Sequence, residues 1–146
     1  MNLTQNKVIE IITTALNNET DISKVGSYPD EVYKIGKSFP SVMIGDGTET
    51  IEHLQGGLDY VIYELPIYIY NSDRYNRISN INIITSSVNK AVINSMFEDG
   101  RVVNVGVDTI TKGDYSEDED WYNPGFYPNL TIRTINFIFE FYTDRV

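Results

Sequence analysis

The sequence predicts a single-domain α+β protein of the order α-β-β-α-β-β, with a largely antiparallel four-stranded sheet and two helices packed on one face of it. Three observations support this prediction. Two segments carry apolar residues at helical spacing, four segments alternate between apolar and polar residues, and 146 residues suit one domain with its own core. We therefore treat residues 1–146 as one folding unit.

The first helix is predicted at about residues 3–17, where Asn2 and Gln5 can cap its start. Its apolar stripe consists of Val8, Ile11, Ile12, Ala15 and Leu16. The second helix is predicted at about residues 77–99, with Gly100 as its stop signal. The stripe of this helix consists of Ile81, Ile84, Val88, Ala91, Val92 and Met96.

The four predicted strands lie at about residues 41–54, 58–70, 101–111 and 130–143. In the first strand, Gly45-Asp46-Gly47 marks a break or bulge. In the second strand, Pro66 cannot donate to a ladder, which places that strand at an edge or at a bulge. In the third strand, we expect Val103, Val105, Val107 and Thr109 to share one face. An additional short extended piece is expected at residues 25–28.

One face of this sheet is unusually apolar for a surface that helices do not cover. We expect it to carry Tyr60, Tyr68, Tyr70, Ile132 and Ile138. Another subunit is a natural cover for such a face, because tyrosine combines a large apolar body with a polar tip. The competing interpretation is that the sheet is covered on both sides within the monomer.

Composition narrows the classes of function. The formal net charge is −10, from 21 acidic and 11 basic residues, so tight non-specific binding to nucleic acid is not expected. An acidic wall would nevertheless suit a passage through which DNA slides. The chain has no cysteine, which excludes disulfides and thiolate metal sites. It shows no signal-peptide pattern and no apolar stretch of membrane-spanning length.

No catalytic pattern emerges, so we predict no enzyme activity, no metal and no cofactor. His53 is the one histidine in the chain, and no nucleophile elbow, phosphate-binding glycine loop or zinc spacing accompanies it. A metal-assisted enzyme using Glu49, Glu52 and Asp59 is the alternative, but their spacing does not favour it.

A long acidic and aromatic loop is predicted at residues 113–129, between the last two strands. The spacing of Asp114, Ser116 and Asp118 resembles the opening of a calcium loop, but the positions that require Gly and Glu hold Glu119 and Gly125. The loop either docks a partner subunit or folds back on its own sheet. Its candidate contact residues are Glu117, Asp118, Glu119, Asp120, Trp121 and Tyr122.

Five segments that together cover most of the chain carry a family resemblance. They are the amphipathic helix at residues 8–16, the sequence Phe39-Pro40-Ser41-Val42-Met43-Ile44 that enters a strand, the aromatic-aliphatic strand at 60–70, the helix at 78–97 and the closing strand at 129–142. This layout resembles the tail-terminator and tail-completion proteins of long-tailed bacteriophages.

The resemblance implies a structural virion protein that forms a ring, commonly a hexamer, on the head-proximal end of the tail tube. The implied partners are further copies of the chain, the tail tube protein, a neck or head-completion protein and, in a contractile tail, the sheath protein. DNA would pass only as cargo, no membrane is involved, and assembly in the host cytoplasm precedes residence in the tail or neck of the virion. The resemblance offers no catalytic residues and no counterpart of the acidic loop.

Two other functions stay open at this stage. The chain could be a neck or head-completion connector of the same particle, which binding to portal rather than to tube would reveal. It could also be a non-catalytic adaptor domain, which would stay monomeric at high concentration.

Overall fold

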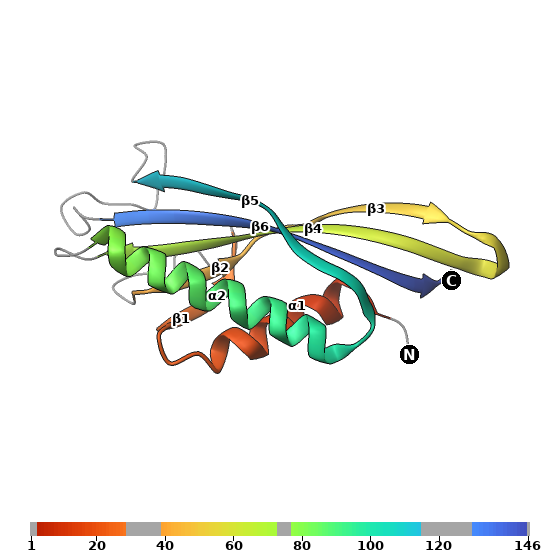
Figure 1. The fold of residues 1–146 in the computed structure, drawn as a ribbon, viewed down its shortest axis with the longest axis horizontal. Coiled ribbons are helices and arrows are strands. Elements are labelled where there is room, and N and C mark those ends of the chain that lie inside the picture. The colour runs from red at the N-terminus through yellow and green to blue at the C-terminus, as the bar shows by residue number, and fades with distance from the viewer. Residues whose placement is uncertain (1–2, 29–38, 73–76, 115–129, 146) are drawn as a thin grey trace.

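The computed structural model describes residues 3–28, 39–72, 77–114 and 130–145, and it confirms an α+β fold with two helices and a mostly antiparallel sheet (Figure 1). Along the chain, the elements are α1 (Gln5–Asn17), β1 (Lys24–Ser27), β2 (Ser41–Ile44), β3 (Thr48–His53), the 3-10 turn η2 (Gln55–Gly57), β4 (Leu58–Ser72), α2 (Arg77–Asp99), β5 (Val102–Asp114) and β6 (Leu130–Asp144). The sheet has six strands in the described residues, rather than the four that the sequence predicts.

The sheet runs in the order β1-β2-β4-β6-β5, and β3 also pairs with β4. Strands β4 and β6 pair along their whole length, from Leu58 with Asp144 to Ser72 with Leu130. The predicted first strand is divided into β2, which pairs with residues 67–70 of β4, and β3, which pairs with residues 59–64. The expected extended piece near residue 25 is β1, which pairs parallel to β2.

The division between β2 and β3 lies opposite Pro66. The backbone N–H of Gly45 donates to the carbonyl oxygen of Pro66 at 2.9 Å. In an antiparallel ladder the N–H and C=O groups of one residue point to the same neighbour, so the missing donor of Pro66 faces the break at residues 45–47. Pro66 can therefore sit in a strand that has neighbours on both sides.

Both helices pack on one face of the sheet (Figure 1). In α1 the buried residues Val8, Ile12 and Leu16 recur every four positions, and Thr4 caps the helix by accepting from the backbone N–H of Lys7. The cap is thus Thr4 rather than the predicted pair near Asn2. The sheet residues beneath the helices are fully or almost fully buried: Val61, Tyr63, Leu65, Ile67, Ile69, Ile135, Phe137, Phe139 and Phe141.

Strand β5 departs from its predicted alternation, so the expectation that Val103, Val105, Val107 and Thr109 share a face was wrong. The register shifts between Val102 and Asn104, and again between Val107 and Thr109. Each shift inserts one unpaired residue and reverses the alternation that follows. Val105 and Val107 pack against the core, whereas the side chain of Val103 is 58% exposed and Thr109 bonds Asn136 across the other face.

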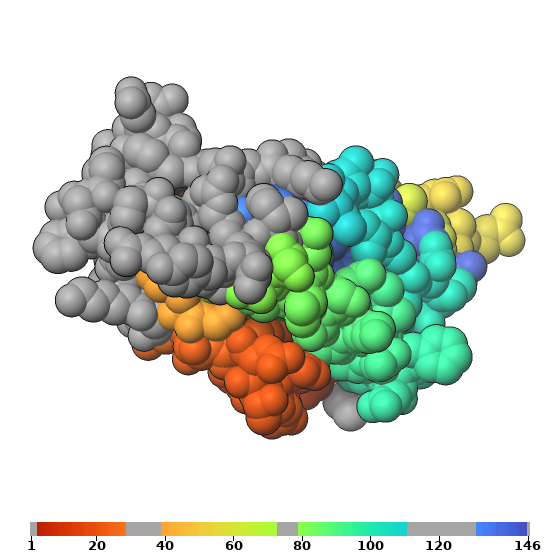
Figure 2. Space-filling model, turned by 60° about the vertical axis from the view of Figure 1, so that its left-hand side comes forward, coloured from red at the N-terminus to blue at the C-terminus, as the bar shows by residue number. Residues whose placement is uncertain are grey.

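One end of the sheet extends beyond the helices (Figure 1). We call β3, η2 and the first residues of β4 the hairpin arm. All six residues of β3 are exposed, and Figure 2 shows this segment, in yellow, protruding at one end of the molecule. Within the described residues, no helix is long and apolar enough to cross a membrane.

Candidate functional site

The sheet face opposite the helices, which we call the open face, is the candidate functional surface. Alternation along residues 58–69 of β4 and 131–141 of β6 separates it from the core, since every second residue of these stretches is buried on the helix-facing side. Among the described elements, no helix packs on this face. Its members are Tyr60, Ile62, Glu64, Pro66 and Tyr68 on β4, and Ile132, Thr134, Asn136, Ile138, Glu140 and Tyr142 on β6.

Aromatic pairs mark both ends of the open face. At the hairpin-arm end, the rings of Tyr60 and Tyr142 lie 5.1 Å apart at 53°, and Tyr142 is 46% exposed. At the other end, the ring of Tyr68 lies 4.7 Å from that of Tyr28 at 47°. Tilted pairs of this kind hold their rings in fixed orientations, which lowers the entropy lost when a partner covers them.

Polar groups on the open face are tied to one another. Glu140 accepts a hydrogen bond from Asn104 Nδ2 at 2.7 Å. Partial burial, followed by the neighbouring Glu140 carboxylate, raises the pKa of Tyr60 above its ordinary value. Asn136 Nδ2 donates to Thr109 Oγ1 at 2.6 Å. The face therefore combines ordered polar groups with apolar area, as subunit interfaces do.

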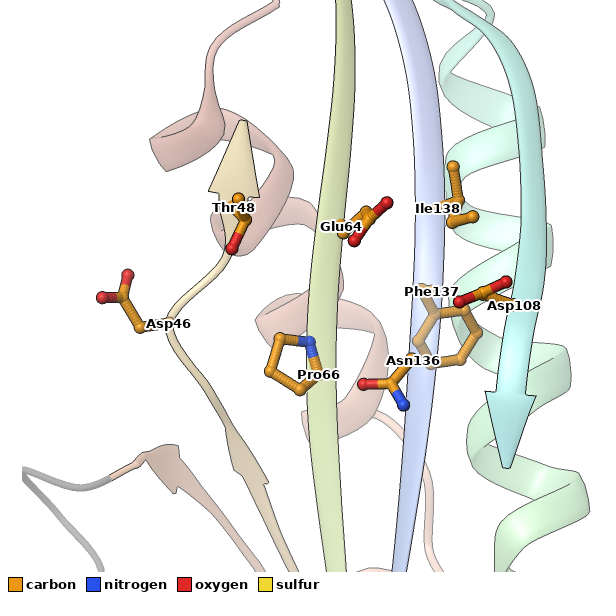
Figure 3. A pocket seen from close by; sticks show the side chains of 8 residues that line it. All are labelled: Asp46, Thr48, Glu64, Pro66, Asp108, Asn136, Phe137 and Ile138. Atoms are coloured by element: carbon orange, nitrogen blue, oxygen red, sulfur yellow. The ribbon is translucent and has the colours of Figure 1, made fainter. Parts of the chain in front are cut away.

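A hollow of about 190 Å³ indents the middle of the open face, and Figure 3 shows the side chains around it. Three carboxylates border it, from Asp46 in the β2–β3 break, Glu64 on β4 and Asp108 at a bulge of β5. In the described part of the chain, no three His, Asp or Glu side chains come close enough together to hold a metal ion. The hollow is an acidic indentation of the open face.

The three carboxylates considered for an enzyme are not all brought together, since Glu49 and Asp59 line one hollow on the helix-facing side of the sheet while Glu52 lies on the other side. The register places Glu52 opposite Tyr60, on the open face, and Glu49 opposite Tyr63, on the face that carries the core. Because paired residues share a face, the two glutamates point to opposite sides of the sheet. The third, Asp59, is engaged in a separate network.

That network fastens the hairpin arm to the end of β6. Asp59 Oδ1 lies 2.6 Å from His53 Nδ1 and accepts from Arg145 Nε at 3.0 Å. Arg145 also donates through Nη2 to the carbonyls of Leu54 and Leu58, at 3.0 and 3.3 Å. The contact with His53, reinforced by Arg145, holds the pKa of the Asp59 carboxyl below its ordinary value despite its partial burial.

The residues that the sequence nominated as contacts fall into three groups. Tyr60 and Tyr68 lie half-buried on the open face. Tyr70 is only 2% exposed, because the register encloses it between Ser41 on β2 and Ile132 on β6, so it offers little contact area. Glu117, Asp118, Glu119, Asp120, Trp121 and Tyr122 lie outside the described residues.

Sequence reasoning missed Tyr142 and Arg145. Tyr142 continues the alternation of Ile138 and Glu140, so extending the strand pattern by one more pair would have found it. Arg145 meets Asp59 from 86 residues away, a distance over which no local pattern gives a signal.

Comparison with known proteins adds no relative to this picture: no protein-family model matches the sequence, and a search of curated proteins gives no significant match.

Proposed function

We propose that this chain is a structural protein that assembles into a ring through the open face of its sheet, and that it acts as a tail terminator of a long-tailed bacteriophage. The observation that carries the proposal is a sheet with helices on one side and a tyrosine- and isoleucine-bearing face on the other. A face of this composition is more apolar than an ordinary solvent-facing surface and suits burial by a second copy.

A closed ring of identical subunits needs two different surfaces on each subunit, because every copy contacts its neighbours head to tail. The open face supplies one surface. The hairpin arm is the second candidate. Strand β3 is exposed along its full length, and among the described strands it pairs with β4 on one side only. Exposed strand edges readily pair with another chain, and an arm of this form can reach an adjacent subunit.

The net charge of the chain agrees with the proposed role, since 21 acidic and 11 basic residues give −10. An acidic lining keeps phosphate backbones from adhering, which allows DNA to pass through a ring.

Two lysine substitutions test whether the open face is the subunit contact. Ile138→Lys puts a charge at the centre of the open face, where it would lie buried in an interface. Phe97→Lys is the matched control, because Phe97 is 79% exposed on α2. We expect both variants to give wild-type circular dichroism, and only Ile138→Lys to remain monomeric by light scattering.

The reverse result, with Phe97→Lys monomeric and Ile138→Lys assembled, would move the contact to the helices and defeat the open-face proposal. A wild-type chain that stays monomeric both at high concentration and in the presence of tail tubes would defeat the terminator proposal itself and favour an adaptor domain.

A further inference from the structure

A buried arginine lies on the helix-facing side of β6. Arg133 is 4% exposed, and the register places it between Ile69 on β4 and Lys112 on β5. Its Nη1 donates to the carbonyl oxygen of Ile132 at 3.1 Å, while its Nε has no hydrogen-bond partner. Buried guanidinium groups with an unused donor are rare and point to a missing acceptor.

The other two arginines whose side chains the structure describes are paired with carboxylates. Arg101 makes two bonds of 2.7 Å to Asp99, and Arg145 bonds Asp59. In the described residues, no carboxylate forms an ion pair with Arg133, although it is the most deeply buried of the three. A buried charge without a counter-ion is costly, so its retention calls for an anionic partner.

Arg133 lines a hollow of about 410 Å³ between α2 and the sheet. The remaining residues that line it are Asn82, Thr85, Ser86 and Asn89 from α2, and Ile110 from β5. The hydroxyl of Thr85 donates a hydrogen bond to the carbonyl oxygen of Ile81, whereas Asn89 Oδ1 is buried without a hydrogen-bond partner. Two unused polar atoms, one of them on a cation, thus line one hollow.

We propose that this hollow is a binding site for a carboxylate, with Arg133 as the charged anchor and Asn82, Ser86 and Asn89 as polar neighbours. The planar guanidinium presents parallel donors that match the two oxygens of a carboxylate. The side-chain amides can turn their NH₂ groups toward an anion, because the two ends of an amide are interchangeable by rotation. A water molecule could bridge Arg133 and Asn89, but it would leave the buried charge without compensation.

The carboxylate can come from two sources. One is a free small carboxylate. The other is the acidic stretch of the chain itself, Glu117, Asp118, Glu119 and Asp120. This stretch belongs to the segment that joins β5 to β6, and β6 begins three residues before Arg133. This proposal does not depend on the phage assignment.

Nuclear magnetic resonance of the arginine Nε–Hε groups tests the site directly. Arg133→Lys assigns the signal, and sodium acetate is titrated against sodium chloride at equal ionic strength. The Arg101 signal is the internal control, because Asp99 already occupies that guanidinium. If the chemical shift of the Arg133 signal changes saturably with acetate but not with chloride, the hollow binds free carboxylates.

A second protein, in which Glu117 and Glu119 become Gln and Asp118 and Asp120 become Asn, distinguishes the two sources. If the acidic stretch occupies the site, the Arg133 signal moves in this variant, and acetate then binds to the variant but not to the wild type. If acetate moves the Arg133 signal in neither protein, the proposal is overturned and water is the sole occupant.

Placing a carboxylate in the hollow gives an independent readout. Asn89→Asp adds a carboxylate to the lining of the hollow that also holds Arg133, and we expect it to raise the melting temperature and to weaken acetate binding at least tenfold. Asn94→Asp adds the same charge at an exposed position of α2 and is the matched control. Equal melting temperatures for the two variants, together with unchanged acetate binding to Asn89→Asp, would contradict the site.

Discussion

Replacement of Gly47 by alanine should destabilise the protein through one identifiable contact. A Cβ built at Gly47 would overlap the ring and hydroxyl of Tyr63. Tyr63 is 1% exposed, its ring centroid is 6.3 Å from that of Phe139, and burial raises the pKa of its phenol to about 12. The ring therefore has little room to retreat into the core.

The magnitude follows from the cost of overpacking. Forcing one extra methyl group into a well-packed region costs about 1–3 kcal/mol, so Gly47→Ala should lower the free energy of unfolding by about that amount. For a domain of this size, each kcal/mol corresponds to about 4 °C in melting temperature. Urea unfolding followed by circular dichroism measures the difference.

Gly106→Ala is the matched control, because a Cβ at Gly106 meets nothing within 4 Å. Alanine there should be neutral or should stabilise by about 0.4–1 kcal/mol, since it restricts the unfolded chain. In a double-mutant cycle, Tyr63→Leu should remove most of the penalty of Gly47→Ala. Equal stability of Gly47→Ala and Gly106→Ala would refute the packing of Tyr63 against the β2–β3 break.

Three further predictions concern the hairpin arm and the acidic loop. The pKa of Asp59 is lower in the folded protein than its ordinary value, so the stability that Asp59 contributes is present above the ordinary carboxyl pKa and is lost as pH falls through the folded pKa. Urea unfolding midpoints measured at pH 6, 4 and 3 should therefore fall more steeply for the wild type than for Asp59→Asn, and parallel curves would contradict this. The Arg145 side chain donates to the carbonyls of Leu54 and Leu58, so Arg145→Ala should speed hydrogen exchange of the amides at residues 54–58 and leave exchange in α2 unchanged. Equal exchange rates at residues 54–58 in the variant and the wild type would show that these bonds do not stabilise the hairpin arm. Trp121→Ala should weaken assembly, as measured by light scattering, and should leave the monomer folded. An unfolded monomer would instead place Trp121 in the core.

The helices and the long strands could be predicted from the sequence because their side chains follow one period throughout. Burial alternates over residues 58–69 of β4 and 131–141 of β6, and β4 begins at Leu58 as predicted. The predicted bounds of α2 also agree with the structure, and Gly100 has the positive φ of 78° expected of a residue that ends a helix.

Strand β5 could not be predicted in the same detail. Its run of valines at positions 102, 103, 105 and 107 fits either face, and only pairing with β6 decides where the bulges fall. The burial of Tyr70 was missed for a related reason. Alternation predicts the side of the sheet on which a side chain lies, but not how closely the neighbouring strands enclose it. Contacts such as Asp59 with Arg145 depend on the complete topology.

The open face was the part of the candidate site that could be predicted, because it depends on alternation alone. The sequence placed Tyr60, Tyr68, Ile132 and Ile138 on it, and the structure has all four half-buried opposite the helices. The buried position of Arg133 could not be anticipated, because a single arginine in an apolar alternation gives no sign of which groups surround it.

Negative-stain imaging of the purified protein, alone and mixed with tail tubes, decides whether the chain forms a ring that closes a tube. We expect rings with a central hole, or density capping one end of each tube, and the loss of both with Ile138→Lys. A wild-type protein that stays monomeric and leaves the tube ends bare would contradict this expectation.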